Sequence, residues 1–344
     1  MGVSKEIKVD EWVRHFMVTL GGVEGKIEGR GEGFRRERDE MGELTEEEMR
    51  RELKKLKMGK ATEADGIKNE AWLNGGGKIR LKLGEVISGV WRGDGFPDSW
   101  RVGVVVPIWK RGDRNVVENY RGVTLTSTAY KIYANIVNER IIKELDENEG
   151  WSRSQAGFRR GRGTIENVKV LKYLVGKRIG RGKKVWAFFL DLKAAFDRLD
   201  REVLWQMMRK RGINEGLIGR VREIYAETRC RVRIGEVVSR EFWVEKGVRQ
   251  GCPLSPTLFN IYIADLEEEL MKCRWGGVRV GGDRVRSLEY ADDIVVVAEE
   301  EEGLREMMRV LIGYLEGKKL ELSANKSKVM MFKKGGGKEK ERIW

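Results

Sequence analysis

The sequence predicts an α+β fold in which helices cover one face of an antiparallel sheet. Two observations predict it. From residue 185 onward, apolar runs alternate with amphipathic stretches in the order strand, helix, helix, hairpin, helix, hairpin, helix, strand. Two of the apolar runs also adjoin acidic residues, at Asp191 and at the pair Asp292-Asp293. Because carboxylates are costly to bury in a core, this placement indicates a site at one end of the sheet.

The composition favours a polyanionic partner. The 344 residues include 68 Lys and Arg against 55 Asp and Glu, a net charge of +13. Such an excess is expected of a protein that binds nucleic acid, and it fits a basic protein that is merely soluble equally well. Three cysteines without C-x-x-C spacing and a single histidine argue against a zinc site, a disulfide framework and a histidine-based triad. No apolar run approaches the roughly 18 residues of a membrane span, and the amino terminus lacks an apolar signal core, so cytosol or nucleus is expected.

The first 43 residues are expected to form a helix and a flexible charged linker. Apolar residues recur at helical spacing over residues 7–20, whereas residues 21–42 are rich in glycine and charge with little to bury. A capping box at Thr45–Glu48 then starts a second helix that ends near Gly59. The glycines at positions 75–77 predict a loop.

A basic loop follows the strand predicted over residues 102–109. Lys110 and Arg121 belong to this loop, which is either a phosphate clamp or a solvated hairpin tip. A helix is predicted over residues 129–141, ending before Asp146.

A second basic loop spans residues 155–163 and is rich in glycine. Its composition suits a nucleic-acid backbone, with Arg159, Arg160 and Arg162 as the cations. Phe158 is expected either to stack on a base or to anchor the loop.

The run from Val185 to Leu190 is a buried strand that delivers Asp191 at its carboxyl end. A helix follows to a glycine stop at Gly212, and another covers residues 217–225. Residues 229–234 alternate strictly, which predicts a half-buried strand whose arginine face meets either nucleic acid or water.

Small residues flank Gln250 in the segment 247–256, which feeds a helix capped by Ser255. They allow a flat group to approach the backbone closely, although the segment by itself favours a well-capped strand-to-helix connection. Beyond the Asp292-Asp293 turn, a helix is predicted over residues 304–315 and an interrupted strand over residues 320–332.

The Asp292-Asp293 turn alone is either an ordinary Asx turn or a metal site. Asp191 supplies a third carboxylate on a neighbouring strand, and three carboxylates at one sheet end can hold the two divalent ions used for in-line phosphoryl transfer. Lys110 and Arg121 would neutralise a triphosphate. The residues therefore predict a metal-dependent nucleotidyl transferase that acts on nucleic acid.

Several segments resemble motifs of reverse transcriptases, in family order and at family-like spacing. The palm motifs are similar to residues 187–197, 247–256, 290–293 and 322–328 of this chain. The fingers motifs of non-LTR (LINE-type, jockey-like) retrotransposon enzymes resemble residues 107–113, 119–121 and 155–159. Together the resemblance covers roughly Glu43 to Phe332.

The resemblance implies a right-hand polymerase, with fingers and upstream helices over residues 44–184, an RRM-like palm over residues 185–332 and a disordered tail over residues 333–344. It implies an RNA-directed DNA polymerase that uses two Mg²⁺ or Mn²⁺ ions, dNTPs, an RNA template and a DNA primer. Carried over by position, the metal ligands are Asp191, Asp292 and the Leu192 carbonyl, and Asp293 is a supporting carboxylate. Phe196 is the aromatic that blocks a ribose 2′-hydroxyl, and Gln250 and Gly251 lie against the nascent base pair. Lys326 lies near the triphosphate and is a proton donor to pyrophosphate.

Two departures from the family pattern are present. Gly122 stands where relatives commonly have proline, which predicts a looser turn at Arg121, and Gly163 stands where they often have a hydroxyl. No endonuclease segment precedes residue 1 and the chain stops where a thumb would begin, so a fragment with an absent or truncated thumb is expected. A group II intron-type maturase or RNA polymerase, and an inactive remnant that only binds nucleic acid, remain the alternatives.

Overall fold

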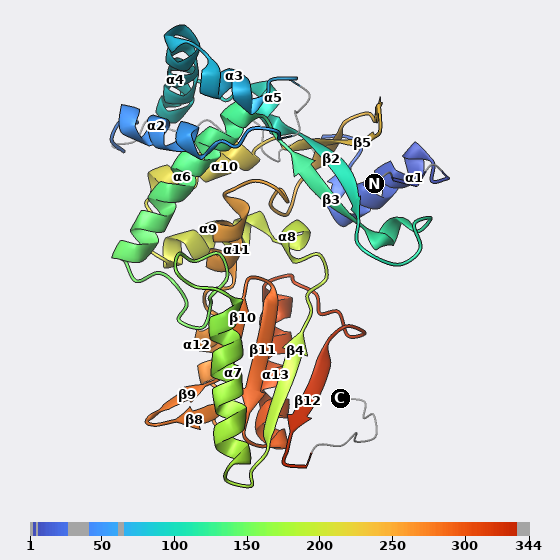
Figure 1. The fold of residues 1–344 in the computed structure, drawn as a ribbon, viewed down its shortest axis with the longest axis vertical. Coiled ribbons are helices and arrows are strands. Elements are labelled where there is room, and N and C mark those ends of the chain that lie inside the picture. Colours follow the sequence, from blue (N-terminus) through green and yellow to red (C-terminus); the bar gives the residue numbers. More distant parts are fainter. Residues whose placement is uncertain (1–2, 5, 27–40, 61–64, 336–344) are drawn as a thin grey trace. The chain divides into compact units, whose positions relative to one another are not determined.

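The computed structural model describes residues 3–4, 6–26, 41–60 and 65–335, which pack into two compact units (Figure 1). Unit 1 comprises Met1–Asn148, Phe196–Arg201 and Met208–Ser255, and unit 2 comprises Glu149–Ala195, Glu202–Met207 and Pro256–Trp344. These units differ from the contiguous segments expected from the sequence, because unit 1 also takes in parts of residues 185–332. The assignment of segments to fingers and palm therefore stays a prediction.

Unit 1 is built on a six-stranded sheet with the strand order β1-β7-β5-β2-β3, in which β6 also pairs with β5. Its strands are β1 (Gly22–Val23), β2 (Val102–Trp109), β3 (Tyr120–Leu125), β5 (Arg229–Ile234), β6 (Val237–Val238) and β7 (Phe242–Val244). Its helices are α1 (Val9–Thr19), α2 (Glu46–Lys55), α3 (Asn69–Asn74), α4 (Gly77–Arg92), α5 (Asp98–Arg101), the 3-10 helix η1 (Val117–Asn119), α6 (Thr128–Glu147), most of α8 (Ala195–Arg198) and α10 (Glu215–Tyr225). Helix α9 (Arg201–Lys210) contributes to both units.

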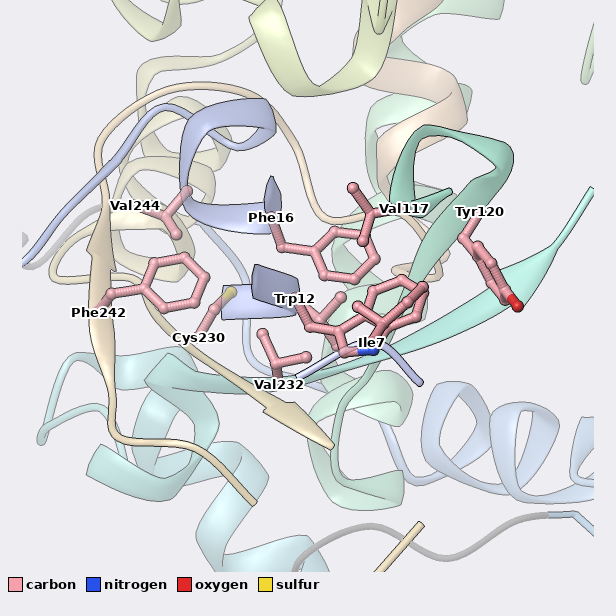
Figure 2. Close-up of a cluster of buried hydrophobic side chains, with 10 residues drawn as sticks. Ile7, Trp12, Phe16, Val117, Tyr120, Cys230, Val232, Phe242 and Val244 are labelled. Carbon is pink, nitrogen blue, oxygen red and sulfur yellow. The ribbon is translucent and has the colours of Figure 1, made fainter. Parts of the chain in front are cut away.

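Helix α1 packs its apolar stripe against this sheet, as the helical spacing of residues 7–20 predicts. Figure 2 shows Trp12 and Phe16 of α1 among side chains from η1, β3, β5 and β7. Trp12 is fully buried, and its ring meets the Tyr120 ring edge-on at a centroid distance of 4.7 Å. The amino-terminal helix is therefore part of the core of unit 1.

Replacing Trp12 with alanine is expected to lower the free energy of unfolding by about 3–5 kcal/mol, because the change leaves a large cavity among side chains from five elements. Val18 on the same helix is 75% exposed, so Val18→Ala should change the free energy of unfolding by less than about 0.5 kcal/mol. Urea unfolding of the two variants measures the difference. Similar effects for both would contradict the packing of α1 on the sheet.

Three expectations for unit 1 were wrong in part. Residues 22–23, expected in a flexible linker, form β1 and pair with Val244 and Trp243 of β7, whereas residues 27–40 of that linker lie outside the described residues. The capping box at Thr45 is confirmed, but α2 ends at Lys55 rather than near Gly59. Gly77, expected in a loop, begins α4, a helix that the glycine cluster concealed.

Unit 2 is built on an antiparallel four-stranded sheet with the order β10-β11-β4-β12, together with a two-stranded ribbon β8-β9. Its strands are β4 (Val185–Leu190), β8 (Val278–Val280), β9 (Asp283–Val285), β10 (Ser287–Tyr290), β11 (Asp293–Ala298) and β12 (Lys328–Phe332). Its helices are α7 (Thr164–Ile179), α11 (Ser255–Tyr262), α12 (Leu266–Met271) and α13 (Glu301–Gly317). The antiparallel sheet is confirmed, whereas the β8-β9 ribbon was not predicted.

Helices cover both faces of the four-stranded sheet, so the expectation of one covered face was wrong. Leu174 of α7 packs in one apolar cluster with Ala187 of β4 and Val297 of β11, whose side chains share one face of the sheet. Helix α13 also contacts β4 and β11, but its residues are not part of this cluster (Figure 1). Phe188 and Val296 alternate to the other face and are buried there. Within the described ranges, every helix is too short or too polar to cross a membrane.

Candidate active site

Asp191 directly follows β4, where the apolar run of the sequence places it. Its backbone N–H donates to Ser327 Oγ at 3.0 Å, and its carbonyl oxygen accepts from Ser323 N at 2.8 Å. The Oδ2 atom lies 3.6 Å from Lys326 Nζ, is shielded from solvent and accepts no hydrogen bond from the described residues. The strand end therefore presents a carboxylate oxygen whose nearby counterion is an ammonium group.

The second pair of carboxylates lies at the β10-β11 hairpin. Tyr290 pairs with Asp293, which leaves Ala291 and Asp292 as a two-residue turn. Ala291 has a φ of 57°, in the left-handed region that tight hairpin turns require. The prediction of two strands joined at the aspartates is confirmed, with Asp292 at the tip and Asp293 at the start of β11.

Strand register brings Asp191 and the hairpin to the same end of the sheet. Ile294 of β11 pairs with Leu190 of β4, and continuing this antiparallel register by one residue sets Asp191 beside Asp293. Among the residues that the structure describes, however, no three histidine, cysteine or acidic side chains form a group able to hold a metal. The three aspartates thus do not form the single cluster that the sequence suggested.

The Leu192 carbonyl is a further oxygen at this strand end. Leu192 forms an isolated antiparallel bridge with Leu322, whose hydrogen bonds use the Lys193 N–H and the Asp191 carbonyl. The Leu192 carbonyl consequently points away from that neighbour. The carboxylates of Asp191 and Asp292 and the Leu192 carbonyl suit Mg²⁺, which commonly binds through one or two carboxylates plus substrate phosphates. The shielded Asp191 oxygen and this set of hard donors fit a divalent cation.

Gln155 holds the turn that carries Asp292, a role that the sequence did not reveal. Its Oε1 accepts from the N–H groups of Ala291 and Gly157, both at 2.8 Å, and its Nε2 donates to the Ala291 carbonyl at 3.3 Å. A Cβ on Gly157 would lie 2.2 Å from Ala291 N, so only glycine permits this approach. The one signal in the sequence was the Gln155-Ala-Gly157 motif itself.

The arginines of the loop 155–163 are not equivalent. The Arg159 guanidinium donates to the carbonyl of Gln155, at the start of the loop, and to that of Ser152, which precedes the loop. Arg159 therefore holds the start of the loop in place. Arg160 and Arg162 lie with Arg159 on this loop, and Arg162 is exposed. Phe158 is 52% exposed, and its ring centroid lies 6.5 Å from that of Tyr290. Phe158 therefore leaves an aromatic face open beside the hairpin.

Lys110 and Arg121 lie at the same end of the β2-β3 hairpin of unit 1. Ile108 pairs with Arg121, and the Lys110 N–H donates to the Asn119 carbonyl just beyond the paired residues. Both cations act electrostatically on Asp197, whose pKa they lower against a larger rise from burial. This loop thus concentrates positive charge around a buried carboxyl group.

Phe196, Gln250 and Gly251 also belong to unit 1. The Phe196 ring is half-buried on α8, so it is not a core residue, and its carbonyl accepts from Val248 N at 2.8 Å. Gly251 has a φ of 115°, and a Cβ there would lie 2.6 Å from the Thr124 carbonyl oxygen. The close backbone approach predicted around Gln250 is real, although the group that approaches is strand β3.

Sequence reasoning missed Asp197, which ends the motif 187–197. Its carboxylate is buried and accepts a hydrogen bond from Gln250 Nε2 at 2.6 Å. Burial raises the pKa of Asp197 to about 7. The local signal in the sequence was that an acidic residue directly follows Phe196, at a position where the helix turns its side chain toward the protein interior.

Two arginines on the outer face of β5 pair with an acidic side chain of the same unit. Arg229 Nη1 lies 3.1 Å from Glu241 Oε2, and Arg231 also pairs with Glu241. The strand is half-buried as predicted, with Cys230 and Val232 inside. Glu241, an acidic side chain of the same unit, therefore lies against this face.

Residues 108–343 match the family described as reverse transcriptase (RNA-dependent DNA polymerase). The chain belongs to the reverse transcriptase family. The matched range contains the candidate site residues from Lys110 to Lys326, so the resemblance carried by the sequence motifs is confirmed.

Proteins of mobile elements are similar to this reverse transcriptase domain. A 149 kDa protein of transposon TX1 from Xenopus laevis is 28% identical over 258 residues, which cover 75% of this chain and 20% of that protein. A Pol polyprotein of retrotransposable element R2 from Popillia japonica is 24% identical over 242 residues, covering 70% and 34%. An RNA-directed DNA polymerase from mobile element jockey of Drosophila funebris is 26% identical over 255 residues, covering 74% and 27%. The chain spans about a fifth to a third of these relatives.

Solved telomerase structures share the fold of the reverse transcriptase domain. Apo telomerase from Candida tropicalis, truncated from its C-terminal domain, superposes with a TM-score of 0.54 at 15% identity over 72% of this chain and 53% of that chain. Telomerase from Candida albicans in complex with a fragment of telomeric RNA gives a TM-score of 0.51 at 14% identity, over 71% and 44%. At this identity the likeness shows the fold alone, an arrangement of mixed helices and sheets.

The structure explains one departure of this reverse transcriptase domain from its family pattern. Gly122 does not lie in a loose turn, as expected, but in β3, where it pairs with Pro107. A Cβ on Gly122 would lie 2.7 Å from the Phe16 ring and 2.9 Å from Val105. Glycine at this position therefore admits the packing of α1. At the second departure, the Gly163 N–H donates to Glu166 Oε2 at 2.7 Å and starts α7.

Proposed function

We propose that this reverse transcriptase domain is an RNA-directed DNA polymerase that adds dNTPs to the 3′-hydroxyl of a primer. The observation that supports the proposal is the convergence of Asp191 and the Asp292 turn at one end of β4 and β11, in a chain of this family. The name of the jockey relative and the telomeric RNA bound to a fold neighbour support an RNA template and a DNA product. In this proposal the four-stranded sheet is the palm, and the β2-β3 hairpin belongs to the fingers.

Asp191, Asp292 and the Leu192 carbonyl would hold the divalent ions, Mg²⁺ or Mn²⁺, and Asp293 is a supporting carboxylate. When two ions are bound, they supply a lowered pKa for the attacking 3′-hydroxyl and neutralisation of the departing pyrophosphate. The Lys326 ammonium lies 3.6 Å from Asp191 Oδ2 and neutralises part of the negative charge there. In this proposal it also donates a proton to pyrophosphate.

The remaining roles concern substrate binding. Lys110 and Arg121 bind the triphosphate, Gln250 and Gly251 contact the nascent base pair, and Phe196 excludes a ribose 2′-hydroxyl. Arg160 and Arg162 contact the nucleic-acid backbone, with Phe158 stacking on a base. Arg159 positions the loop, because its guanidinium donates to the carbonyls of Ser152 and Gln155.

Single-nucleotide extension tests this function. A labelled DNA primer annealed to an RNA template is incubated with the protein, Mg²⁺ and one dNTP at a time. The expected product is a primer longer by one nucleotide only with the dNTP complementary to the next template base. Salt-sensitive RNA binding without any incorporation would instead indicate a remnant that only binds nucleic acid.

Replacing Phe196 with valine is expected to admit rNTPs. The smaller side chain removes the half-buried ring proposed to meet the 2′-hydroxyl, so the ratio of rNTP to dNTP incorporation should rise by about 10–100-fold, a steric effect of roughly 1–3 kcal/mol. The measurement is kcat/KM for each nucleotide on the same template. An unchanged ratio in a variant that still incorporates dNTPs contradicts the role of Phe196.

A further inference from the structure

Asp197 of unit 1 is a buried carboxylate that the assigned roles do not use, and it pairs with the half-buried Gln250. Asp197 is 4% exposed, and its Oδ2 accepts a hydrogen bond from Gln250 Nε2 at 2.6 Å. The other carboxylate oxygen, Oδ1, is buried and accepts no hydrogen bond from any described residue. A buried carboxylate with a single hydrogen-bond donor is costly to keep, which calls for a reason beyond packing.

The backbone around the pair leaves little freedom except at the amide itself. Val248 N donates to the Phe196 carbonyl at 2.8 Å, Gly247 N donates to the Leu199 carbonyl at 2.7 Å, and Thr124 N donates to the Gln250 carbonyl at 2.7 Å. A Cβ on Gly247 would lie 2.5 Å from the Asp197 carbonyl oxygen, so the two segments touch through backbone atoms. The carboxylate and the amide therefore meet on fixed backbones.

The chemistry of the two groups selects one orientation of the amide. A glutamine side chain has a donor end and an acceptor end, whereas an ionised carboxylate only accepts. Nε2 must then face Asp197, and the reverse orientation would set two oxygens against each other. Burial raises the pKa of Asp197 to about 7, and the positive charge of Lys110 and Arg121 opposes that rise, so the ionised form prevails above pH 7. The Gln250 Oε1 is left as the end of the amide that a ligand can use.

We propose that Asp197 is a positioning residue that fixes the Gln250 amide with its carbonyl oxygen outward, as an acceptor for the incoming nucleotide or nascent base pair. The orientation of the amide follows from the structure alone, and its use in nucleotide selection rests on the proposed polymerase function. Loss of Asp197 would let the amide turn over. The amide would then present its Nε2 donor to the nucleotide for about half of the time, in place of the Oε1 acceptor. Such a site binds the correct nucleotide more weakly and discriminates less against the wrong one.

The first test reads the amide without any activity. The sequence contains three glutamines, Gln155, Gln206 and Gln250, so selective ¹⁵N-glutamine labelling gives three side-chain amide pairs, assigned with Gln→Glu variants. In Asp197→Asn the Gln250 pair is expected to move toward the shifts of exposed Gln206, while the Gln155 pair stays in place. Identical Gln250 signals in wild type and Asp197→Asn would overturn the proposal.

A pH titration of the same signals separates the groups that face Asp197. Lys110, Arg121 and Cys230 interact with it electrostatically, and burial raises the pKa of Cys230 to about 11, far from neutral pH. The Gln250 amide should therefore shift near pH 7 in wild type and lose this transition in Asp197→Asn. A transition that persists in the variant would assign it to another group.

The second test is a double-mutant cycle in single-nucleotide extension. Asp197→Asn is expected to raise KM for the correct dNTP by about 10-fold with a smaller change in kcat, and to have no further effect in a Gln250→Ala background. Gln206→Ala is the matched control, because Gln206 is exposed on α9. Additive effects of the two changes would sink the positioning role while leaving the polymerase function intact. Coupled amide signals in a protein that incorporates no nucleotide would sink the function and leave the orientation of Gln250 standing.

Discussion

The Asp292→Asn variant is expected to lose at least about 10³-fold of template-directed dNTP incorporation, the scale seen when a group central to the chemistry is removed. The change removes one of two carboxylates proposed to hold the divalent ions, and it keeps the size of the side chain. Asparagine suits a tight two-residue hairpin turn, so the Tyr290–Asp293 pair and the fold should persist. Single-turnover extension on an RNA template measures the loss.

The matched control for this variant is Asp283→Asn. Asp283 is an exposed aspartate on β9 of the same unit and has no role in the proposed site. It should retain wild-type incorporation. Equal rates for Asp292→Asn and wild type would remove Asp292 from the site, and a loss of activity in both variants would point to a general effect of charge.

Glu289 alone is expected to lower the free energy of unfolding by about 3 kcal/mol as pH rises from about 4.5 to about 7. This carboxyl group on β10 is fully buried, and burial raises its pKa from 4.5 to about 7, partly opposed by hydrogen bonds from Ser154 and Ser287. A raised carboxyl pKa means that the folded protein binds a proton which the unfolded chain has released. The stabilising contribution is therefore complete below pH 4.5 and is lost as pH passes 7, at about 1.4 kcal/mol for each unit of pKa difference.

Replacing Glu289 with glutamine should remove this dependence. Glutamine keeps an oxygen that can accept from the Ser154 and Ser287 hydroxyls, which lie 2.6 and 2.8 Å from Glu289 Oε1, and it does not ionise. Urea unfolding of both proteins between pH 4.5 and 8.5 gives the comparison. The difference in free energy of unfolding, variant minus wild type, should grow in favour of the variant up to about pH 7. Parallel curves would show that Glu289 does not titrate in this range.

The parts of the site that the sequence predicts are those set by local pattern. A continuous apolar run from Val185 to Leu190 forms a buried strand wherever a sheet exists, so Asp191 had to emerge at its end. The Tyr290–Asp293 segment lies between two apolar runs and is too short for anything but a tight turn. Motif order then indicated the family, which the match over residues 108–343 confirms.

The parts that the sequence did not predict depend on contacts between distant residues. Gln155 bonds Ala291 across 136 positions, and Asp197 bonds Gln250 across 53, distances at which periodicity carries no information. Glu241 occupies the arginine face of β5 only because β5 and β7 pair. Helix α4 was missed because glycine at position 77 weakens helical propensity locally, while Trp91 and its neighbours bury the helix through tertiary packing.

Iron-mediated cleavage tests whether Asp191 and Asp292 hold a divalent cation at one end of the four-stranded sheet. Fe²⁺ replaces Mg²⁺ at oxygen sites, and with ascorbate and peroxide it generates radicals that cut the chain next to the bound metal. If the two aspartates hold the ion, cuts are expected near residues 191–192 and 291–293, and these cuts should be suppressed by Mg²⁺ and missing in the Asp292→Asn variant. Cuts confined to other segments, or cuts at these positions that persist in the variant, would contradict this assignment.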